Sequence, residues 1–306
     1  MPPEATLAHS TAIEGIGLHS GAKARLGLLS AAAGSGIQFR RVDLDGFVVE
    51  AKSANIAKVS YATSLMKKGV FISTTEHVLS ALMGEGVDNV VVELDSLEVP
   101  ILDGSAAPFV EMITAAKLKR QQRRRRVMEI VEPLELREGE KFIGIYPCRE
   151  YRLHYRIDFA HPVIGKQEFE LEVTPESYRR ELAPARTFGF LEDFAAMRQQ
   201  GLIRGGRLEN AVVLDERRVI NGELRYRDEF VRHKMLDLIG DLALLGAPLR
   251  AEVRADRAGH ALHTALVQRL VRQRQHWRWA ADRAGEEPKM RVPATTAAAG
   301  ARAYTE

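Results

Sequence analysis

The sequence is poor in cysteine, and this limits the kinds of site that it can build. Among its 306 residues there is one cysteine, Cys148. A single cysteine cannot form an internal disulfide and has no partner for a cysteine-based zinc site. Any metal site must therefore use histidine and carboxylate ligands.

Long hydrophobic runs and a large excess of one charge are also missing. No uninterrupted apolar run approaches the length of a membrane span, and residues 1–10 lack the basic start and apolar stretch of a secretory signal. We therefore expect a cytoplasmic protein. Lys plus Arg number 44 against 41 for Asp plus Glu, a balance too even to indicate a nucleic-acid-binding protein.

The positive charge is concentrated in one run, residues 117–126, and a strand-like stretch follows it. A solvated linker explains such a run, and so does a basic strip that contacts anionic lipid headgroups or a phosphorylated ligand. The chain is long enough for about two domains. We predict an N-terminal domain at 1–119, a basic linker at 120–126, a C-terminal domain at 127–279 and a mobile tail at 280–306.

Each half combines several strands with two or three helices. Strand patterns occupy residues 23–28, 90–94, 127–132, 141–146 and 152–158. Helical patterns occupy residues 73–83, 106–118, 190–200, 227–245 and 259–274. This mixture favours a layered α+β architecture over a βαβ repeat.

The helical segment 230–241 carries the most informative polar pattern. It places His233, Asp237 and Asp241 at successive i, i+4 positions along one stripe, with apolar residues on both sides of it. A half-buried His and Asp need a partner, and a metal ion is one. A hydrogen bond or a surface ion pair explains the same spacing, so a metal site needs a third ligand and a base from elsewhere.

Residues 72–82 supply both candidates. The plainest interpretation is a capping box, with Ser73 at the N-cap and Glu76 three residues later. The functional interpretation makes His77 the third ligand and Glu76 the carboxylate that takes a proton from attacking water, an arrangement that zinc hydrolases need. The long gap between His77 and His233 then implies a site between the two domains.

Two more segments offer groups for catalysis. His260 follows Gly259 at a helix start, where it is either a cap or surface residue, or a cation that stabilises an oxyanion or protonates an amine. In residues 184–190, Thr187 could donate a hydrogen bond to a substrate carbonyl. Alternatively, the segment is only a strand end with Phe188 and Phe190 in the core. In the functional interpretation these two side chains contact the substrate.

Together these segments resemble the UDP-3-O-acyl-N-acetylglucosamine deacetylase family, the zinc amidases of lipid A biosynthesis. The resemblance runs in order from about residue 5 to 279. The matching motifs are Gly15-Ile-Gly-Leu-His-Ser-Gly21, Ser73-Thr-Thr-Glu-His77, Val99-Pro-Ile-Leu-Asp-Gly-Ser105, Ala185-Arg-Thr-Phe-Gly-Phe190, Asp228-Glu-Phe-Val-Arg-His-Lys-Met-Leu-Asp237 and Gly259-His-Ala-Leu262.

The resemblance implies a role for each candidate residue. The zinc ligands would be His77, His233 and Asp237. The catalytic residues would be Glu76 as general base, His260 as charged partner, Asp241 orienting it, and Thr187 polarising the acetamide carbonyl. The substrate would contact Lys234, Arg257, Phe188 and Phe190, with Arg257 facing its phosphates.

The resemblance also implies a fold of two α+β domains, each packing two helices against a sheet, with the site in the cleft between them. An insert at about 188–214 would form an apolar passage for the substrate's acyl chain, with apolar surface from Phe190, Phe194, Met197, Leu202 and Ile203. The sequence departs from the family at two places. Arg257 replaces a common Lys, and His263-Thr264 replaces a common Asn-Asn.

We therefore expect a monomeric Zn²⁺ enzyme that hydrolyses the N-acetyl group of UDP-3-O-acyl-N-acetylglucosamine, with no nucleic-acid partner and possible peripheral contact with membrane lipid. Two alternatives stay open. One is a zinc amidase acting on another acylated sugar nucleotide. The other is a nucleic-acid-binding module that uses the basic run.

Overall fold

The computed structural model describes residues 1–57 and 61–280. The mobile tail expected at 280–306 lies, except for Ala280, outside these residues. None of the described helices is long and apolar enough to cross a membrane. The mixture of sheets and helices confirms the expected α+β class.

The first half of the chain forms a five-stranded sheet and two helices. The sheet has the order β2-β3-β8-β4-β5, in which β4 and β8 are parallel and the other neighbours antiparallel. Its strands are β2 (Thr11–Ile16), β3 (Lys23–Ser30), β8 (Val90–Leu94), β4 (Ile37–Arg41) and β5 (Phe47–Glu50). The hairpin β6 (Leu65–Lys67) and β7 (Val70–Ile72) precedes α1 (Glu76–Gly84), and α2 (Ala107–Ala116) packs against α1 and β2.

The second half forms a seven-stranded sheet around a central strand, β17 (Leu249–Asp256). This strand pairs in parallel with β13 (Tyr151–Asp158) on one side; on the other it pairs with β12 (Lys141–Tyr146) and then β10 (Met128–Ile130). The outer strands are β11 (Leu134–Glu138), β14 (Lys166–Glu172) and β18 (Trp277–Trp279). Helices α5 (Glu229–Leu242) and α6 (His260–Arg272) pack against each other and against this sheet, and the short α3 (Pro175–Ser177) follows β14.

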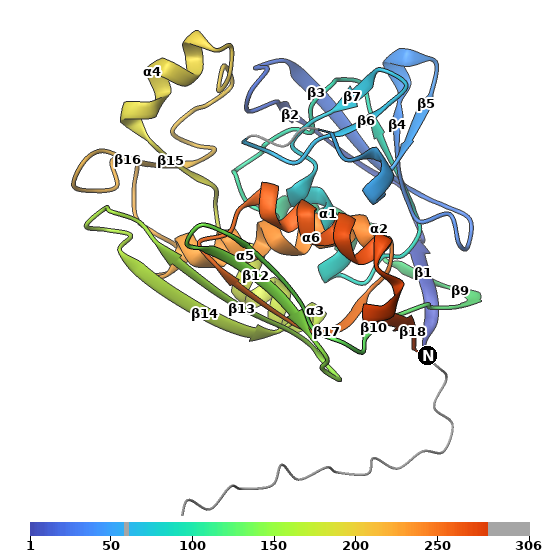
Figure 1. The fold of residues 1–306 in the computed structure, drawn as a ribbon. Coiled ribbons are helices and arrows are strands. Elements are labelled where there is room, and N and C mark those ends of the chain that lie inside the picture. The colour runs from blue at the N-terminus through green and yellow to red at the C-terminus, as the bar shows by residue number, and fades with distance from the viewer. Residues whose placement is uncertain (58–60, 281–306) are drawn as a thin grey trace, which may run out of the picture.

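The helices of the two halves form a middle layer between the sheets (Figure 1). Contact between the halves is closest where α1 meets α5. A Cβ atom added to Gly240 on α5 would lie 2.0 Å from the carbonyl oxygen of Glu76 on α1. Only a glycine at this position lets the two backbones approach so closely, and the approach brings the polar stripe of α5 beside the first turn of α1.

The predicted insert has a structured base. Strand β15 (Phe188–Phe190) pairs in parallel with β16 (Val212–Leu214), so the two ends of the insert lie side by side. Between them, α4 (Leu191–Gln199) extends away from the helical layer (Figure 1). No residue of α4 is fully buried, and its Phe194 and Met197 are half-buried.

The basic run has regular structure, although its sequence pattern indicated no strand. Most of it forms β9 (Leu118–Arg124), which pairs antiparallel with β1 (Pro3–Leu7) at the start of the chain. Most of β9 is exposed on both faces, so its side chains show no alternating apolar pattern. The strand forms because β1, which is largely buried, offers its backbone hydrogen-bonding groups. The domain boundaries themselves stay a prediction.

Candidate metal and catalytic site

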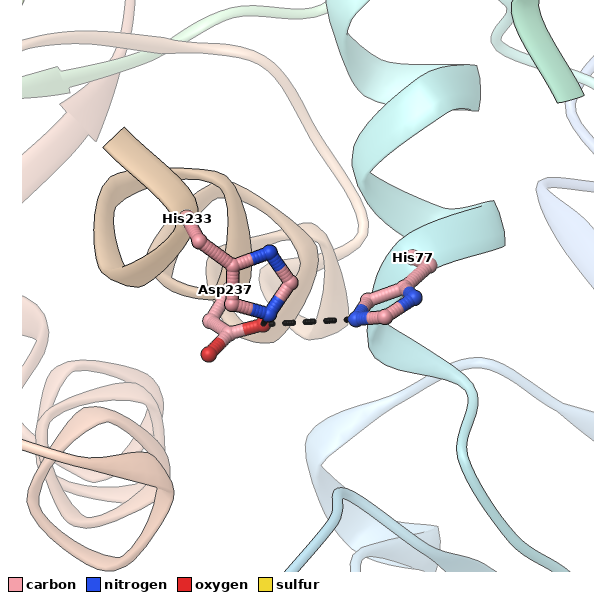
Figure 2. Close-up of side chains that lie close together, drawn as sticks. All are labelled: His77, His233 and Asp237. Atoms are coloured by element: carbon pink, nitrogen blue, oxygen red, sulfur yellow. Dashed lines mark ion pairs between the residues drawn. The ribbon is translucent and has the colours of Figure 1, made fainter. Parts of the chain in front are cut away.

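Three predicted ligands come together where α1 meets α5. Figure 2 shows His77 on α1 pointing toward His233 and Asp237 on α5. All three are buried, and their donor atoms all lie within 4.8 Å of one another. The i, i+4 spacing of the last two puts them on one face of α5, as the sequence predicts.

The distances suit one tetrahedral ion. Two ligand atoms that are each about 2.0–2.1 Å from a tetrahedral zinc ion lie about 3.3 Å apart. Oδ1 of Asp237 lies 3.3 Å from Nε2 of His233 and 3.6 Å from Nε2 of His77. Two imidazoles and one carboxylate also form a typical donor set for a hydrolytic zinc site with an open position.

The surroundings prepare these groups as ligands. Nδ1 of His233 lies 3.0 Å from the carbonyl oxygen of Ala185; donation to this acceptor puts the ring proton there and leaves Nε2 for the metal. Burial lowers the pKa of His233 to about 3, which keeps the imidazole neutral. Burial alone would raise the pKa of Asp237, but His233, Lys234 and His260 hold it well below its usual value. The Lys234 ammonium donates a 2.7 Å hydrogen bond to Asp237 Oδ2.

Glu76 is not part of a capping box. Helix α1 begins at Glu76 itself with Thr75 at the N-cap, and no side chain caps it. Glu76 instead accepts a 3.0 Å hydrogen bond from the backbone N–H of Thr63 through Oε2. The prediction of Ser73 as N-cap was wrong because the chain folds back toward residue 63, a contact that no local pattern signals.

The environment of Glu76 suits a base. The residue is 3% exposed, and burial raises the pKa of its carboxyl group, although His260 and His77 oppose the shift. A raised pKa brings a carboxylate closer to the value at which it can accept a proton from water near neutral pH.

His260 and Asp241 form a second polar group beside the first. Nδ1 of His260 lies 2.8 Å from Oδ2 of Asp241, and its Nε2 lies 3.8 Å from Oδ2 of Asp237. Burial alone would lower the pKa of His260, but Asp241 and Asp237 raise it to about 9. The ring is therefore a cation whose Nε2 lies beside Asp237, one of the three predicted ligands.

This second group includes two residues that we did not predict. Nδ1 of His263 also lies 2.8 Å from Oδ2 of Asp241, and the Thr63 hydroxyl donates to Oδ1. Asp241, His260 and His263 could be taken for a further metal site. However, Nδ1 of His260 and Nδ1 of His263 each lie 2.8 Å from the same oxygen, Oδ2 of Asp241. Two ligand atoms of one zinc ion lie about 3.3 Å apart. Hydrogen bonds therefore hold this group together.

Comparison with known proteins identifies the family of the chain. The model of the UDP-3-O-acyl N-acetylglycosamine deacetylase family, LpxC, matches residues 4–272. The chain belongs to this family. It is 50% identical over 269 residues to the UDP-3-O-acyl-N-acetylglucosamine deacetylase of Solibacter usitatus (strain Ellin6076), across 88% of this chain and 91% of that relative.

Among the other residues suggested by the family resemblance, Phe188 lies near the ligands, with its ring centroid 6.5 Å from that of His233. Thr187 is half-buried and follows Ala185, the partner of His233, by two residues. Phe188 packs edge-on against Phe230 and Phe159, with ring centroids 4.9 and 5.7 Å apart. Phe190 lies 6.1 Å from Phe159 by the same measure. The sequence pattern missed Phe159, which no motif singled out.

Both predicted substrate-binding cations border one cavity. Lys234 and Arg257 line a space of about 470 Å³ together with Lys141 and Phe159. The Arg257 guanidinium donates a 2.7 Å hydrogen bond to Oε2 of Glu140, which also lines this space. An anion entering the cavity would therefore compete with Glu140 for Arg257.

Proposed function

We propose that this chain hydrolyses the N-acetyl group of UDP-3-O-acyl-N-acetylglucosamine, giving acetate and the free 2-amino sugar, as a Zn²⁺ enzyme of lipid A biosynthesis in the cytoplasm. The observation that best supports this proposal is that the donor atoms of His77, His233 and Asp237 lie at distances expected for the ligands of one tetrahedral ion. The buried Glu76 precedes His77 directly in the chain. The family and the Solibacter usitatus relative supply the substrate, since both are named after the deacetylation of this sugar nucleotide.

The proposed metal is zinc, held by His77, His233 and Asp237. When bound, zinc supplies a Lewis acid that polarises the acetamide carbonyl and lowers the pKa of water from near 16 to about 7. Glu76 takes the proton as water adds to the carbonyl carbon. The C–N bond then breaks, the nitrogen gains a proton and acetate leaves.

The chain's other groups stabilise the charge that develops. Thr187 would donate a hydrogen bond to the acetamide oxygen, and the His260 cation, oriented by Asp241, would stabilise the negative charge as it forms there. Glu76 and His260 are both candidates for delivering the proton to the amine. Comparing the pH profiles of variants at these two positions distinguishes between them.

The substrate's remaining parts have candidate contacts. Lys234 and Arg257 would meet the diphosphate in the cavity that they line, where Phe159 supplies the aromatic wall. Phe188 and Phe190, whose rings pack against Phe159, would contact the substrate beside it. For the acyl chain, Leu202 of the insert borders a second space of about 500 Å³ with Tyr61, Phe71 and Leu97. These apolar side chains support the proposed passage at 188–214.

Metal analysis combined with an acetate-release assay tests the proposal. We expect about one zinc per chain, and much slower acetate release when the substrate lacks its acyl chain. Equal rates with and without the acyl chain would favour an amidase for another sugar nucleotide. Absence of bound metal together with steeply salt-dependent binding to nucleic acid would favour the nucleic-acid-binding alternative.

A further inference from the structure

A buried network behind His260 connects Asp241 to two groups that the proposed chemistry does not use, His263 and Tyr155. The side chain of His263 lies between the carboxylate of Asp241 and the hydroxyl of Tyr155. Its Nδ1 is 2.8 Å from Oδ2 of Asp241, and its Nε2 is 2.9 Å from the Tyr155 hydroxyl oxygen. Both His263 and Tyr155 are fully buried, so neither is placed to contact a substrate.

The network contacts His260 from two directions. Through Asp241, it reaches Nδ1 of the His260 ring at 2.8 Å. Through Tyr155, whose hydroxyl donates a 2.8 Å hydrogen bond to the carbonyl oxygen of Ala258, it reaches the backbone just before α6. His263 joins these two contacts from one turn further along α6, at i+3 from His260.

The protonation of His263 follows from its partners. Burial lowers the pKa of His263, so the ring is neutral and carries a single N–H. Because an ionised Asp241 can only accept, this proton lies on Nδ1, and Nε2 and the Ala258 carbonyl oxygen both face the single proton of the Tyr155 hydroxyl. Asp241 thus receives three hydrogen bonds, from His260, His263 and Thr63.

A carboxylate with three fixed donors has little freedom to rotate, and the imidazole that it holds is oriented with it. The imidazole of His263 spans the gap from Asp241 to the Tyr155 hydroxyl, and the second contact holds the ring in place. We propose that His263, supported by Tyr155, is a positioning residue that fixes Asp241 and thereby the His260 ring for hydrolysis. This inference rests on the proposed function.

Kinetics of the His263→Ala variant of the full chain, with UDP-3-O-acyl-N-acetylglucosamine as substrate, test the proposal. We expect kcat to fall about 10- to 100-fold, the usual cost of removing a group that orients a catalytic residue. KM and the zinc content should stay at the wild-type values, because His263 contacts neither the predicted ligands nor the cavity bordered by Lys234. An unchanged kcat, or a loss confined to KM, would overturn the proposal.

A double-mutant cycle separates positioning from a general loss of stability. If His263 acts through Asp241, then His263→Ala added to Asp241→Ala should cause almost no further loss of kcat. Losses that multiply independently would overturn the proposal. His263→Asn keeps an N–H donor and should restore most of the turnover lost in His263→Ala. If the alanine variant folds poorly, the asparagine variant still tests the proposal.

Tyrosine variants provide the matched control. Tyr155→Phe removes only the hydroxyl at the far end of the network and should lower kcat by less than His263→Ala. Tyr178 is equally buried and donates a 3.0 Å hydrogen bond to Ser80, outside this network. Tyr178→Phe should therefore reduce stability and leave kcat unchanged, and equal kcat losses in both tyrosine variants would contradict the assignment.

The wild-type assay distinguishes the two levels of inference. Acetate release by the wild type together with full activity of His263→Ala would refute the positioning role alone. A wild-type enzyme that releases no acetate would refute the proposed function, and the inference with it.

Discussion

Replacing Glu76 with glutamine should separate its chemical role from its structural one. The only hydrogen bond to its carboxylate from the described residues comes from the Thr63 N–H, and the glutamine amide oxygen can accept the same bond. The amide cannot take a proton from water. A positioned general base contributes roughly 10²- to 10⁴-fold to a rate, so kcat should fall by at least about 100-fold, or about 3 kcal/mol of transition-state stabilisation.

The same substitution should not weaken the fold. The pKa of Glu76 is raised by burial, which means that the protein disfavours the charged form at this position. A neutral amide removes that cost. We therefore expect a Tm equal to or above that of the wild type, with zinc retained and KM little changed, the pattern of a group kept for activity at the expense of stability.

Glu85→Gln is a matched control from the other end of α1. Glu85 is also buried, and its carboxylate accepts a 2.7 Å hydrogen bond from the Arg179 guanidinium. Its replacement should lower the Tm and leave kcat unchanged. Acetate release at fixed zinc, with melting curves for both variants, makes the comparison. Near-normal turnover in Glu76→Gln would refute the assignment of Glu76 as base.

Four further outcomes follow from the structure. Removing the metal with a chelator should abolish acetate release and lower the Tm, and added zinc should restore both; activity that persists in the metal-free protein would contradict the site. In a pH profile, turnover should fall on a basic limb at or below pH 9, because the pKa of His260 is about 9 and a bound cation lowers it; an unchanged basic limb in His260→Ala would reject this assignment. Gly240→Ala should destabilise the protein by about 1–3 kcal/mol in urea unfolding and also lower kcat, since its new methyl group meets the Glu76 backbone. Lys67 lowers the pKa of Glu50 to about 2 through a side-chain hydrogen bond, so this pair stabilises the fold above pH 4.5 and loses its effect as the pH falls toward 2; Glu50→Gln should therefore cost about 1 kcal/mol or less at pH 7 and nothing near pH 2.

The sequence predicted those parts of the site that lie on periodic helices. The stripe of His233, Asp237 and Asp241 required only that α5 be helical, and the apolar residues around it made that clear. His77 as the third ligand is one of two interpretations of residues 72–82, and the family resemblance then favours it, because nothing in local spacing joins residues 156 positions apart. The α+β class is confirmed, and the catalytic roles of these residues stay predictions.

What the sequence could not give depends on contacts between distant segments. Thr63 and Tyr155 reach Asp241 and His263 from separate strands and loops, and neither sits in a recognisable motif. His263 carried a weak signal, since it lies three residues after His260 on one helix. The strand β9 was missed because its partner β1, not its own pattern of side chains, determines its conformation.

Charge balance explains why metal binding and stability should be linked. Glu76, Asp237 and Asp241 are three carboxylates in one buried region, and the facing cations there are Lys234 and His260. With every carboxylate ionised, the negative charge exceeds the positive by one, and burying uncompensated charge is unfavourable. A divalent ion bound by Asp237 adds two positive charges and so removes the excess of negative charge. At free zinc 100-fold above its dissociation constant, binding should add about 2.7 kcal/mol to the free energy of unfolding, and a metal-free protein as stable as the zinc-bound form would refute this account.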